Sequence, residues 1–252
     1  MLQNKVALIT GAGRGIGRAT AIAFAQAGAD LALLARTKDQ LIEAASLVQQ
    51  AGRQALVIPA DVTDDPNRAI QAVRERFGRL DILVNNAGQA GPIGPVATTN
   101  IEDWRRCVEV NLLAPVAMCQ AALSLMSQGR IINVSSGAGT FAIPYFSAYV
   151  TSKCALIRFS EVLAKEVEAQ GIKVFAIEPG TVRTDLLEKT RASNEAKQWL
   201  PLLDQLVDQH LDIPVEQAAQ FILKLASGQA DELSGRFAMV DGRSGTLTFT
   251  AA

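Results

Sequence analysis

Seven short runs rich in Val, Ile and Leu, separated by longer stretches with helical periodicity, constrain the fold of this chain more than any other feature. The runs cover residues 6–9, 31–34, 55–58, 82–84, 131–134, 174–177 and 237–240. Because nearly every run is apolar on both faces, we interpret them as strands buried on both sides. Stretches such as 18–27, 40–51 and 69–77 repeat apolar residues three or four apart, as helices do. The sequence predicts a doubly wound α/β fold, with a parallel seven-stranded sheet and helices on both faces.

No linker, repeat or low-complexity tract interrupts this alternation, so we predict a single domain over residues 1–252. The rhythm breaks over residues 185–213, which carry no strand run and in which Trp199 and Leu203 share a helical face. We interpret this segment as a helical lid over a substrate site, with a plain pair of surface helices as the alternative. The lone histidine, His210, lies on the same face and is expected to be packed rather than catalytic.

Charge and composition exclude several classes of function. The 24 Lys and Arg residues against 25 Asp and Glu residues leave a net charge of −1, so no charge excess points to nucleic acid or an anionic membrane. With 49% apolar and 19% charged residues, the composition is far from that of disordered chains. Cys107, Cys119 and Cys154 lie far apart and have no CxxC spacing, so neither a disulfide framework nor a metal site is predicted. The N-terminus lacks the layout of a secretory signal and the apolar stretch 112–126 is too short to span a membrane, so we predict a cytoplasmic protein.

Directly after the first strand run stands a glycine-rich segment, Thr10 to Gly17, which reads TGAGRGIG and is followed by a helical stretch. Glycines such as Gly11 and Gly15 let the backbone turn sharply and approach a pyrophosphate, whose charge lies at the helix N-terminus. The strict GxGxxG pattern is not met, because Ile16 stands in place of its third glycine. The position between strand and helix still predicts a nucleotide-phosphate site.

The end of the second strand run bears on the choice of nicotinamide cofactor. An NAD enzyme usually presents Asp or Glu there to the ribose 2′-hydroxyl, and this chain has Ala35. Arg36 follows at once and Arg14 lies in the glycine loop, so two guanidinium groups could reach a 2′-phosphate. We therefore predict NADP(H) in preference to NAD(H), with two solvated surface arginines as the alternative.

Polar segments follow the later strand runs. Asn85 to Gly88, which reads NNAG, ends the fourth run, Ser136 follows the fifth, and Tyr149 and Lys153 begin a helical stretch. Because Tyr149 and Lys153 are four residues apart, they share a helix face, where an ammonium group favours the phenolate and lowers the pKa of the phenol. The spacing predicts that Tyr149 acts as a general acid or base near neutral pH.

Together with the glycine loop, these segments resemble the short-chain dehydrogenase/reductase family, in its compact single-domain branch. The resemblance runs from about Lys5 to Asp241 and implies a Rossmann fold that transfers hydride between nicotinamide and a carbonyl or alcohol substrate. It implies that Tyr149 gives a proton to the substrate oxygen in reduction and removes it in oxidation. Ser136, in preference to its neighbour, would orient that oxygen, and Lys153 would also hold the nicotinamide ribose.

The same resemblance implies further contacts. Asn111 would keep a relay water near Lys153 through its side chain or a kinked backbone carbonyl, with a purely structural role as the alternative. The Asp61 carboxylate would accept from the adenine amine, with a helix N-cap as the alternative. The implied cofactor-binding residues are Gly11, Arg14, Gly15, Ile16, Gly17, Arg36, Asp61, Val62, Asn86, Ala87, Gly88, Tyr149, Lys153, Pro179, Gly180, Val182 and Thr184.

Departures from the family pattern lie away from the reacting centre. Phe175 stands where Asn is frequent, Glu178 places a charge directly before Pro179, and residues 241–243 read DGR in place of DGG. These changes leave the expected chemistry intact but put subunit packing near the C-terminus in doubt. The tail from Ser244 is expected to be disordered or to cross into a neighbouring subunit.

The expected pocket residues are mostly apolar and include no cluster of cations: Gln89, Phe141, Ile143, Tyr145, Leu186 and Trp199. A moderately hydrophobic ketone, aldehyde, 3-oxoacyl or steroid-like substrate would suit such a pocket. Stretches 114–126 and 149–169 are apolar on more than one face, and members of the family usually pair subunits through these helices. We therefore expect a homotetramer or a homodimer.

Two other functions remain open for a chain of this pattern. One is a catalytically idle nucleotide-binding scaffold, since a fold does not dictate a function. The presence of Ser136, Tyr149 and Lys153 together argues against it. The other is a different reaction on the same fold, such as enoyl reduction or sugar epimerisation. The four-residue spacing of Tyr149 and Lys153 argues against the first of these reactions, and the short chain argues against the second.

Overall fold

The strands of the central sheet follow the buried apolar runs. In the computed structural model, which describes residues 1–208, 212–241 and 246–250, they are β1 (Val6–Thr10), β2 (Asp30–Ala35), β3 (Ala55–Pro59), β4 (Ile82–Asn85), β5 (Gly129–Val134), β6 (Ile172–Glu178) and β9 (Phe237–Asp241). All seven pair in parallel, in the order β9-β6-β5-β4-β1-β2-β3. The chain builds outward from β1 to β3, returns to β4 and builds outward in the other direction. The predicted doubly wound α/β fold is confirmed, and its strand order reverses between β1 and β4.

An eighth strand, β10 (Thr246–Phe249), extends the sheet beyond β9. It pairs antiparallel, with Thr246 opposite Asp241 and Phe249 opposite Ala238. The expectation that the tail is disordered or crosses to another subunit is therefore wrong for these four residues, while Ser244 and residues 242–243 lie outside the described residues. The alternation of exposed Thr with half-buried Leu and Phe is typical of an antiparallel edge strand, and it was the signal available in the sequence.

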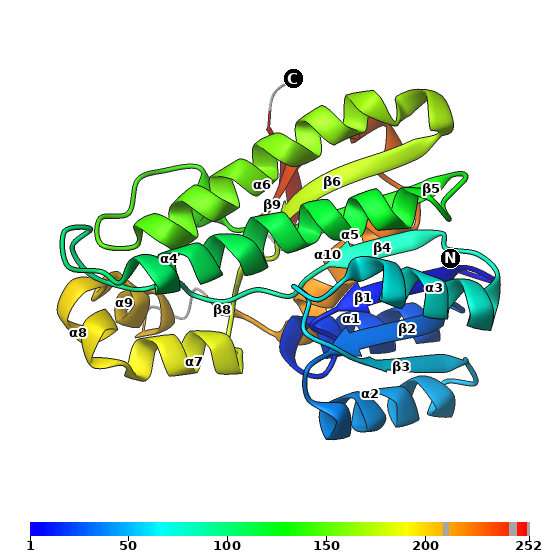
Figure 1. Cartoon of the computed structure of the whole chain (residues 1–252), viewed down its shortest axis with the longest axis horizontal. Helices are drawn as coiled ribbons and strands as arrows, with labels where there is room; N and C mark the ends of the chain where they lie inside the picture. Colours follow the sequence, from blue (N-terminus) through cyan, green and yellow to red (C-terminus); the bar gives the residue numbers. More distant parts are fainter. Residues whose placement is uncertain (209–211, 242–245, 251–252) are drawn as a thin grey trace.

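Helices cover both faces of the sheet (Figure 1). On one face lie α1 (Gly15–Gln26), α2 (Lys38–Gln50) and α10 (Val215–Ala226), which bury residues such as Phe24, Leu41 and Ile222. On the other lie α3 (Pro66–Phe77), α5 (Ala114–Leu123) and α6 (Ser147–Glu166), which bury Ile70, Met118 and Leu163, with α4 (Ile101–Val108) packed on α6. A π-helical turn, Glu109–Leu113, joins α4 to α5. Among the described residues, no helix combines the length and the apolar character that a membrane span requires.

The segment after β6 forms three short helices at one end of the sheet (Figure 1): α7 (Asp185–Ala192), α8 (Asn194–Trp199) and α9 (Leu202–Asp208). The Thr184 hydroxyl caps α7 by accepting from the Leu187 amide at 3.4 Å. Residues 185–213 are not free of strand, contrary to the sequence analysis, because β8 (Asp212–Ile213) pairs in parallel with β7 (Thr181–Val182). His210 lies outside the described residues.

Candidate active site

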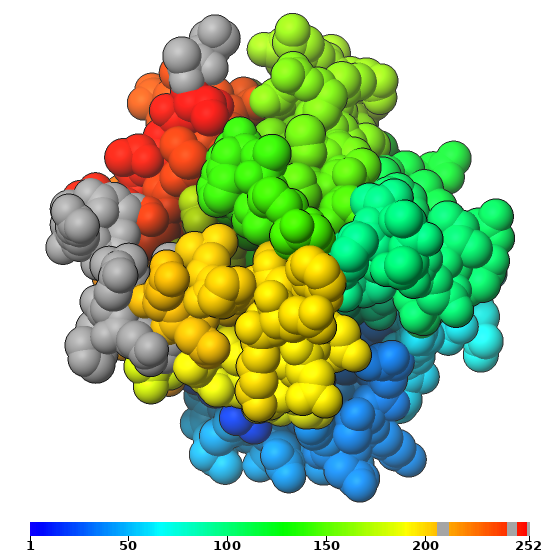
Figure 2. All heavy atoms as spheres, turned by 90° about the vertical axis from the view of Figure 1, so that its left-hand side faces the viewer, coloured from blue at the N-terminus to red at the C-terminus, as the bar shows by residue number. Residues whose placement is uncertain are grey.

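A cavity of about 770 Å³ lies at the carboxyl ends of the parallel strands. Residues that follow successive strands line it: Gly11, Arg36, Asp61, Asn86, Ser136 and Pro179. Residues of α7 and α9 cover it, and Figure 2 shows helices α7–α9 (yellow) between the segment that leads into α6 (green) and the region of α2 (blue). Doubly wound sheets bind their ligands in this crevice, where the strand order reverses.

The glycine loop presents bare backbone to the cavity. Gly11 and Gly15 adopt positive φ angles of 66° and 54°, a region that favours glycine. A Cβ atom on Gly17 would lie 2.2 Å from the Gly11 carbonyl oxygen, so only glycine lets α1 pack this closely on the loop. The Asn86 amide donates to the Thr10 carbonyl at 2.8 Å and fixes the loop from the end of β4. Together with the long cavity, this arrangement fits a dinucleotide whose pyrophosphate lies at the start of α1.

The cavity brings together nearly every residue that the sequence predicted for cofactor binding. Of that set, all except Gly17 line it. Gly17 lies behind the loop, and its role in the structure is the close packing of α1 against Gly11. Residues from Gly11 to Thr184 therefore meet at one site although most of the chain separates them.

A cluster of charges surrounds Asp61 at one end of the cavity. The Asp61 carboxylate accepts from Arg106 at 2.7 Å, lies 3.9 Å from Arg36, and accepts from the Thr63 amide and hydroxyl. Burial raises the pKa of the Asp61 carboxyl, but the Thr63 hydrogen bonds and the two arginines outweigh it and hold the pKa below its ordinary value. The N-cap of α3 is Asp65, so the alternative role of Asp61 as a helix cap is wrong.

Arg106 is a cavity residue that the sequence analysis missed. Its contact with Asp61 joins residues 45 positions apart, and no local pattern around Arg106 signals it. Arg14 also has an unpredicted partner, because it donates to Asp185 of α7 at 2.9 Å. This ion pair connects the glycine loop to the helices that cover the cavity.

Tyr149 and Ser136 face each other across the other end of the cavity. The Tyr149 ring stacks on Phe146, with ring centroids 4.6 Å apart, and the Ser136 hydroxyl donates to the phenol oxygen. Ser135 has a different role, since its buried hydroxyl donates to the Lys153 carbonyl at 2.9 Å. The geometry therefore places Ser136, and not Ser135, beside Tyr149.

Burial governs the ionisation of the Tyr149 phenol and the Lys153 ammonium. Burial raises the pKa of Tyr149, the Ser136 hydrogen bond lowers it, and the electrostatic effects of Cys107 and Glu178 raise it further, so the pKa lies above its ordinary value. Lys153 is 4% exposed, and burial lowers its pKa to about 8. The prediction that Lys153 lowers the pKa of Tyr149 is not met in this structure. The Lys153 Nζ lies 5.8 Å from the ring centroid and donates to the Val134 carbonyl at 2.9 Å.

Asn111 lies fully buried in the π-helical turn. Its Oδ1 accepts from the Gln89 amide at 2.9 Å, and its Nδ2 donates to the Gln89 carbonyl at 2.9 Å and to the Ser152 hydroxyl at 3.1 Å. These bonds occupy the side chain and fix the loop after β4, as the structural alternative expected. Of the two routes to a relay water, only the backbone carbonyl route is compatible with this arrangement, and π-helical turns often accompany functional sites.

The wall under α7–α9 is mainly apolar. Gln89, Phe141, Ile143 and Leu186 line the cavity as expected. Tyr145 and Trp199 do not line it, because their rings pack against each other with centroids 4.5 Å apart. Lining residues on this side that the sequence analysis did not assign to the pocket include Phe146, Glu178, Leu187, Lys189, Leu200, Leu202 and Leu203.

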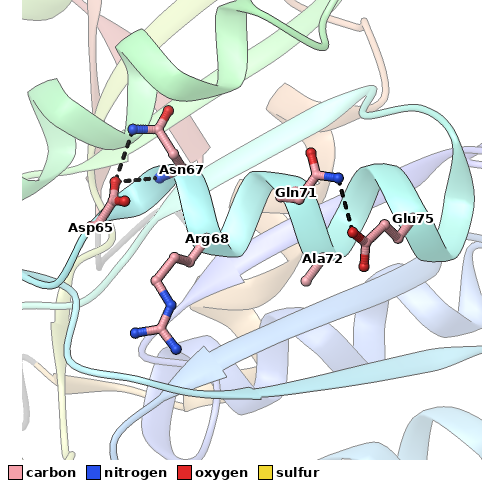
Figure 3. A pocket seen from close by; sticks show the side chains of 6 residues that line it. All are labelled: Asp65, Asn67, Arg68, Gln71, Ala72 and Glu75. Carbon is pink, nitrogen blue, oxygen red and sulfur yellow. Dashed lines mark hydrogen bonds between the residues drawn. The ribbon is translucent and has the colours of Figure 1, made fainter.

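A second hollow lies on the outer surface of α3 (Figure 3). Its side chains pair with one another: the Asn67 amide donates to Asp65 at 2.8 Å, and Gln71 donates to Glu75 at 2.9 Å, while Arg68 extends away from both pairs. These are the cap and the side-chain pairing of an ordinary surface helix. We therefore place the candidate active site in the larger cavity.

A doubly wound sheet with a glycine loop after β1 and a Tyr–Lys pair on α6 defines a dinucleotide-dependent α/β enzyme fold. Residues 5–195 match the family described as short chain dehydrogenase. An uncharacterized oxidoreductase of Thermotoga maritima is 35% identical over 96% of this chain and 98% of its own length. A short chain dehydrogenase of Monascus purpureus is 39% identical over 93% of this chain and 80% of its own length. The crystal structure of NAD⁺-bound xylitol dehydrogenase superposes with a TM-score of 0.86 at 28% identity, over 96% of this chain and 99% of that one.

The chain belongs to the short-chain dehydrogenase family. It is an oxidoreductase of the class that uses a nicotinamide cofactor and acts on alcohol or carbonyl groups.

Proposed function

We propose that this chain transfers a hydride between NADP(H) and a ketone, aldehyde or the corresponding alcohol, with Tyr149 as the acid or base. The observation that carries the proposal is the shared cavity: Ser136, Tyr149 and Lys153 open into the space that the glycine loop also lines. The rival function, an idle nucleotide-binding scaffold, would not need an acid paired with a hydroxyl donor. The resemblance of Ser136, Tyr149 and Lys153 to the pattern of the short-chain dehydrogenase family supports the same conclusion.

A bound nicotinamide would supply the hydride in reduction and accept it in oxidation. In reduction, Tyr149 donates its proton to the substrate oxygen, and its raised pKa keeps the phenol protonated at neutral pH. Ser136 donates to the same oxygen and stabilises the negative charge that develops there. Lys153 would hold the ribose next to the ring, and the Asn111 segment fixes the loop after β4. The leucines of α7 and α9 exclude water from this end of the cavity.

Preference for NADP(H) rests on the charges near the end of β2. Ala35 offers no carboxylate, and Arg36 has 71% of its side chain exposed, with Asp61 3.9 Å away as its ion-pair partner. Arg36 and Arg14 both line the cavity and would hold a 2′-phosphate. Arg14 would do so either by giving up its ion pair with Asp185 or while keeping it. A hydrogen bond to a charged group contributes about 1.5–3 kcal/mol. We therefore expect NADPH to bind at least about tenfold more tightly than NADH.

Calorimetric titration of both reduced cofactors tests this preference without a substrate. Arg36→Ala is expected to weaken NADPH binding by about tenfold and to leave NADH binding nearly constant, because only NADPH carries the phosphate. Ala35→Asp is expected to reverse the preference. Arg18→Ala is the matched control, since Arg18 pairs with Glu43 on the outer face and does not line the cavity. Equal affinity of the wild type for the two cofactors would contradict the proposal.

Turnover tests the hydride transfer itself. We expect NADPH oxidation to depend on an added ketone or aldehyde at neutral pH, with hydrophobic substrates preferred because of the leucine-lined wall. If tight NADPH binding occurs without turnover across a broad panel, the scaffold alternative is correct.

We also propose that α7–α9, the described helices of residues 185–213, act as a substrate lid of a single-domain enzyme, and that the enzyme is a homotetramer or a homodimer. Leu113 and Val162, from the π-helical turn and α6, are 54% and 48% exposed. Both residues belong to the region through which members of the family usually pair subunits, and this resemblance supports the assembly. Light scattering is expected to give two or four times the chain mass of 26.8 kDa, and a monomer would refute the assembly.

A further inference from the structure

Glu178 introduces a carboxyl group into the part of the cavity where the substrate would react. It is the last residue of β6, it lines the cavity, and it precedes Pro179. Its carboxyl group lies over Gly137, the residue after Ser136, and a Cβ atom on Gly137 would come within 2.5 Å of Glu178 Oε1. The carboxylate also accepts from the Gly137 amide. Glu178 is therefore packed against the loop that carries the hydroxyl of Ser136.

This carboxyl group differs from the other two that line the cavity. Asp61 pairs with Arg106 and Arg36, and Asp185 pairs with Arg14. Within the described part of the chain, Glu178 forms no ion pair. The cavity thus holds one acidic group without a cation of the protein beside it.

Burial of a carboxylate without a cation beside it costs free energy, and a ligand with a positive charge can offset this cost. Burial raises the pKa of the Glu178 carboxyl, and the Gly137 amide offsets only part of this effect. The same charge raises the pKa of Tyr149, which favours the protonated phenol that reduction uses and opposes the phenolate that oxidation needs. A positively charged group of a substrate would restore the balance, because it would replace the water lost on burial with a charge-assisted hydrogen bond.

We propose that Glu178 is a specificity-determining residue that binds a protonated amine of the substrate, next to the carbon that Ser136 and Tyr149 activate. The substrate class is an amino alcohol and the corresponding amino ketone, with an apolar remainder packed against residues such as Phe141, Leu187 and Leu203. This inference rests on the proposed hydride transfer. In the oxidation, the carbinol carbon would give a hydride to NADP⁺, the hydroxyl gives its proton to the phenolate form of Tyr149, and the amino ketone remains.

Three alcohols of nearly equal size test the charge directly. They are 2-amino-1-phenylethanol, 1-phenyl-1,2-ethanediol and 1-phenyl-1-propanol, which place an ammonium, a hydroxyl or a methyl group beside the same reacting carbon. At pH 7, kcat/KM for the amine is expected to exceed that for 1-phenyl-1-propanol by at least about tenfold, the effect of one hydrogen bond between charged groups. In Glu178→Gln this ratio is expected to fall by at least about tenfold. The Gln oxygen can still accept from the Gly137 amide, so the loop keeps its support.

Glu188→Gln is the matched control, because Glu188 is an exposed residue of α7 that does not line the cavity. It is expected to keep the wild-type ratio. Glu178→Asp, which retains the charge, is expected to keep more of the preference than Glu178→Gln. A wild-type enzyme without preference for the amine, or a Gln variant that retains it, would overturn the proposal. A preference for the diol over the amine would also overturn it, because the group recognised would then be a neutral donor.

Calorimetry separates this inference from the proposed function. The amine and 1-phenyl-1-propanol are titrated into the enzyme saturated with NADPH, a complex in which no oxidation can occur. Tighter binding of the amine, lost in Glu178→Gln, would support the ammonium site even if no substrate of any kind turned over. Turnover of simple ketones without any preference for the amine in binding or catalysis would leave the hydride transfer standing and overturn the ammonium site.

Discussion

Replacing Tyr149 by Phe is expected to lower kcat for carbonyl reduction by about 10²–10⁴-fold, the usual contribution of a positioned acid. The substitution removes one oxygen atom, the one that receives the Ser136 hydrogen bond, and leaves the ring that stacks on Phe146. Stopped-flow and steady-state measurements of NADPH oxidation give kcat. The dissociation constant of NADPH, measured in parallel, reports separately whether the variant still binds its cofactor.

Tyr145→Phe is the matched control for this variant. It removes the same atom from the only other tyrosine of the chain, which packs on Trp199 and does not line the cavity. We expect its kcat to stay within about twofold of the wild type, since surface changes away from a site have small effects. If Tyr149→Phe retained most of its activity, the assignment of the acid to Tyr149 would be wrong.

Replacing Lys153 by Met is expected to abolish most of the activity and, at the same time, to stabilise the fold. Burial lowers the pKa of Lys153 from 10.5 to about 8, so below pH 8 the folded protein carries a charge that the unfolded chain accommodates more easily. At about 1.4 kcal/mol per pKa unit, removal of this charge would contribute about 3 kcal/mol. Loss of the hydrogen bond to the Val134 carbonyl would cost about 1–3 kcal/mol, so the net gain is expected to be about 1 kcal/mol at pH 7.

The pH dependence of unfolding identifies the cause of this gain. Between about pH 8 and 10.5, the unfolded chain binds more protons at Lys153 than the folded protein does, so the wild-type free energy of unfolding rises with pH on account of this residue. The advantage of Lys153→Met should therefore shrink over that range in urea unfolding experiments. Lys165→Met, at an exposed position near the end of α6, is the control and should show no such trend. A constant difference across this pH range would exclude the buried charge as its source.

The sequence was informative wherever local pattern and buried surface decide the structure. The seven apolar runs became strands because only a doubly wound sheet buries them on both faces, and the glycine loop lay where the first strand meets α1. Ser136, Tyr149 and Lys153 met at one cavity because the carboxyl ends of parallel strands lie at one edge of the sheet.

Contacts between side chains that lie far apart in the sequence could not be predicted from local patterns. The bond between Arg106 and Asp61 and the bond between Arg14 and Asp185 depend on the path of the loops, and nothing in a local pattern specifies it. The pKa of Tyr149 was predicted in the wrong direction because residue spacing reveals which charges are neighbours on a helix but not how deeply they are buried. Glu178 was noticed as a departure from the family pattern, but its place over Gly137 became apparent only from the fold.

The π-helical turn at Glu109–Leu113 determines how well this region of the chain tolerates insertions and deletions. A π turn holds about one residue more than an α turn, and each residue rotates a helix by about 100°. Deleting a single residue here would remove the extra residue of the π turn and would rotate α4 against α5 by about 100°. Either Asn111 would leave Gln89 and Ser152, or Met118 and Cys119 would leave the apolar core. Single-residue insertions and deletions should therefore be tolerated far less in this turn than substitutions of its exposed side chains.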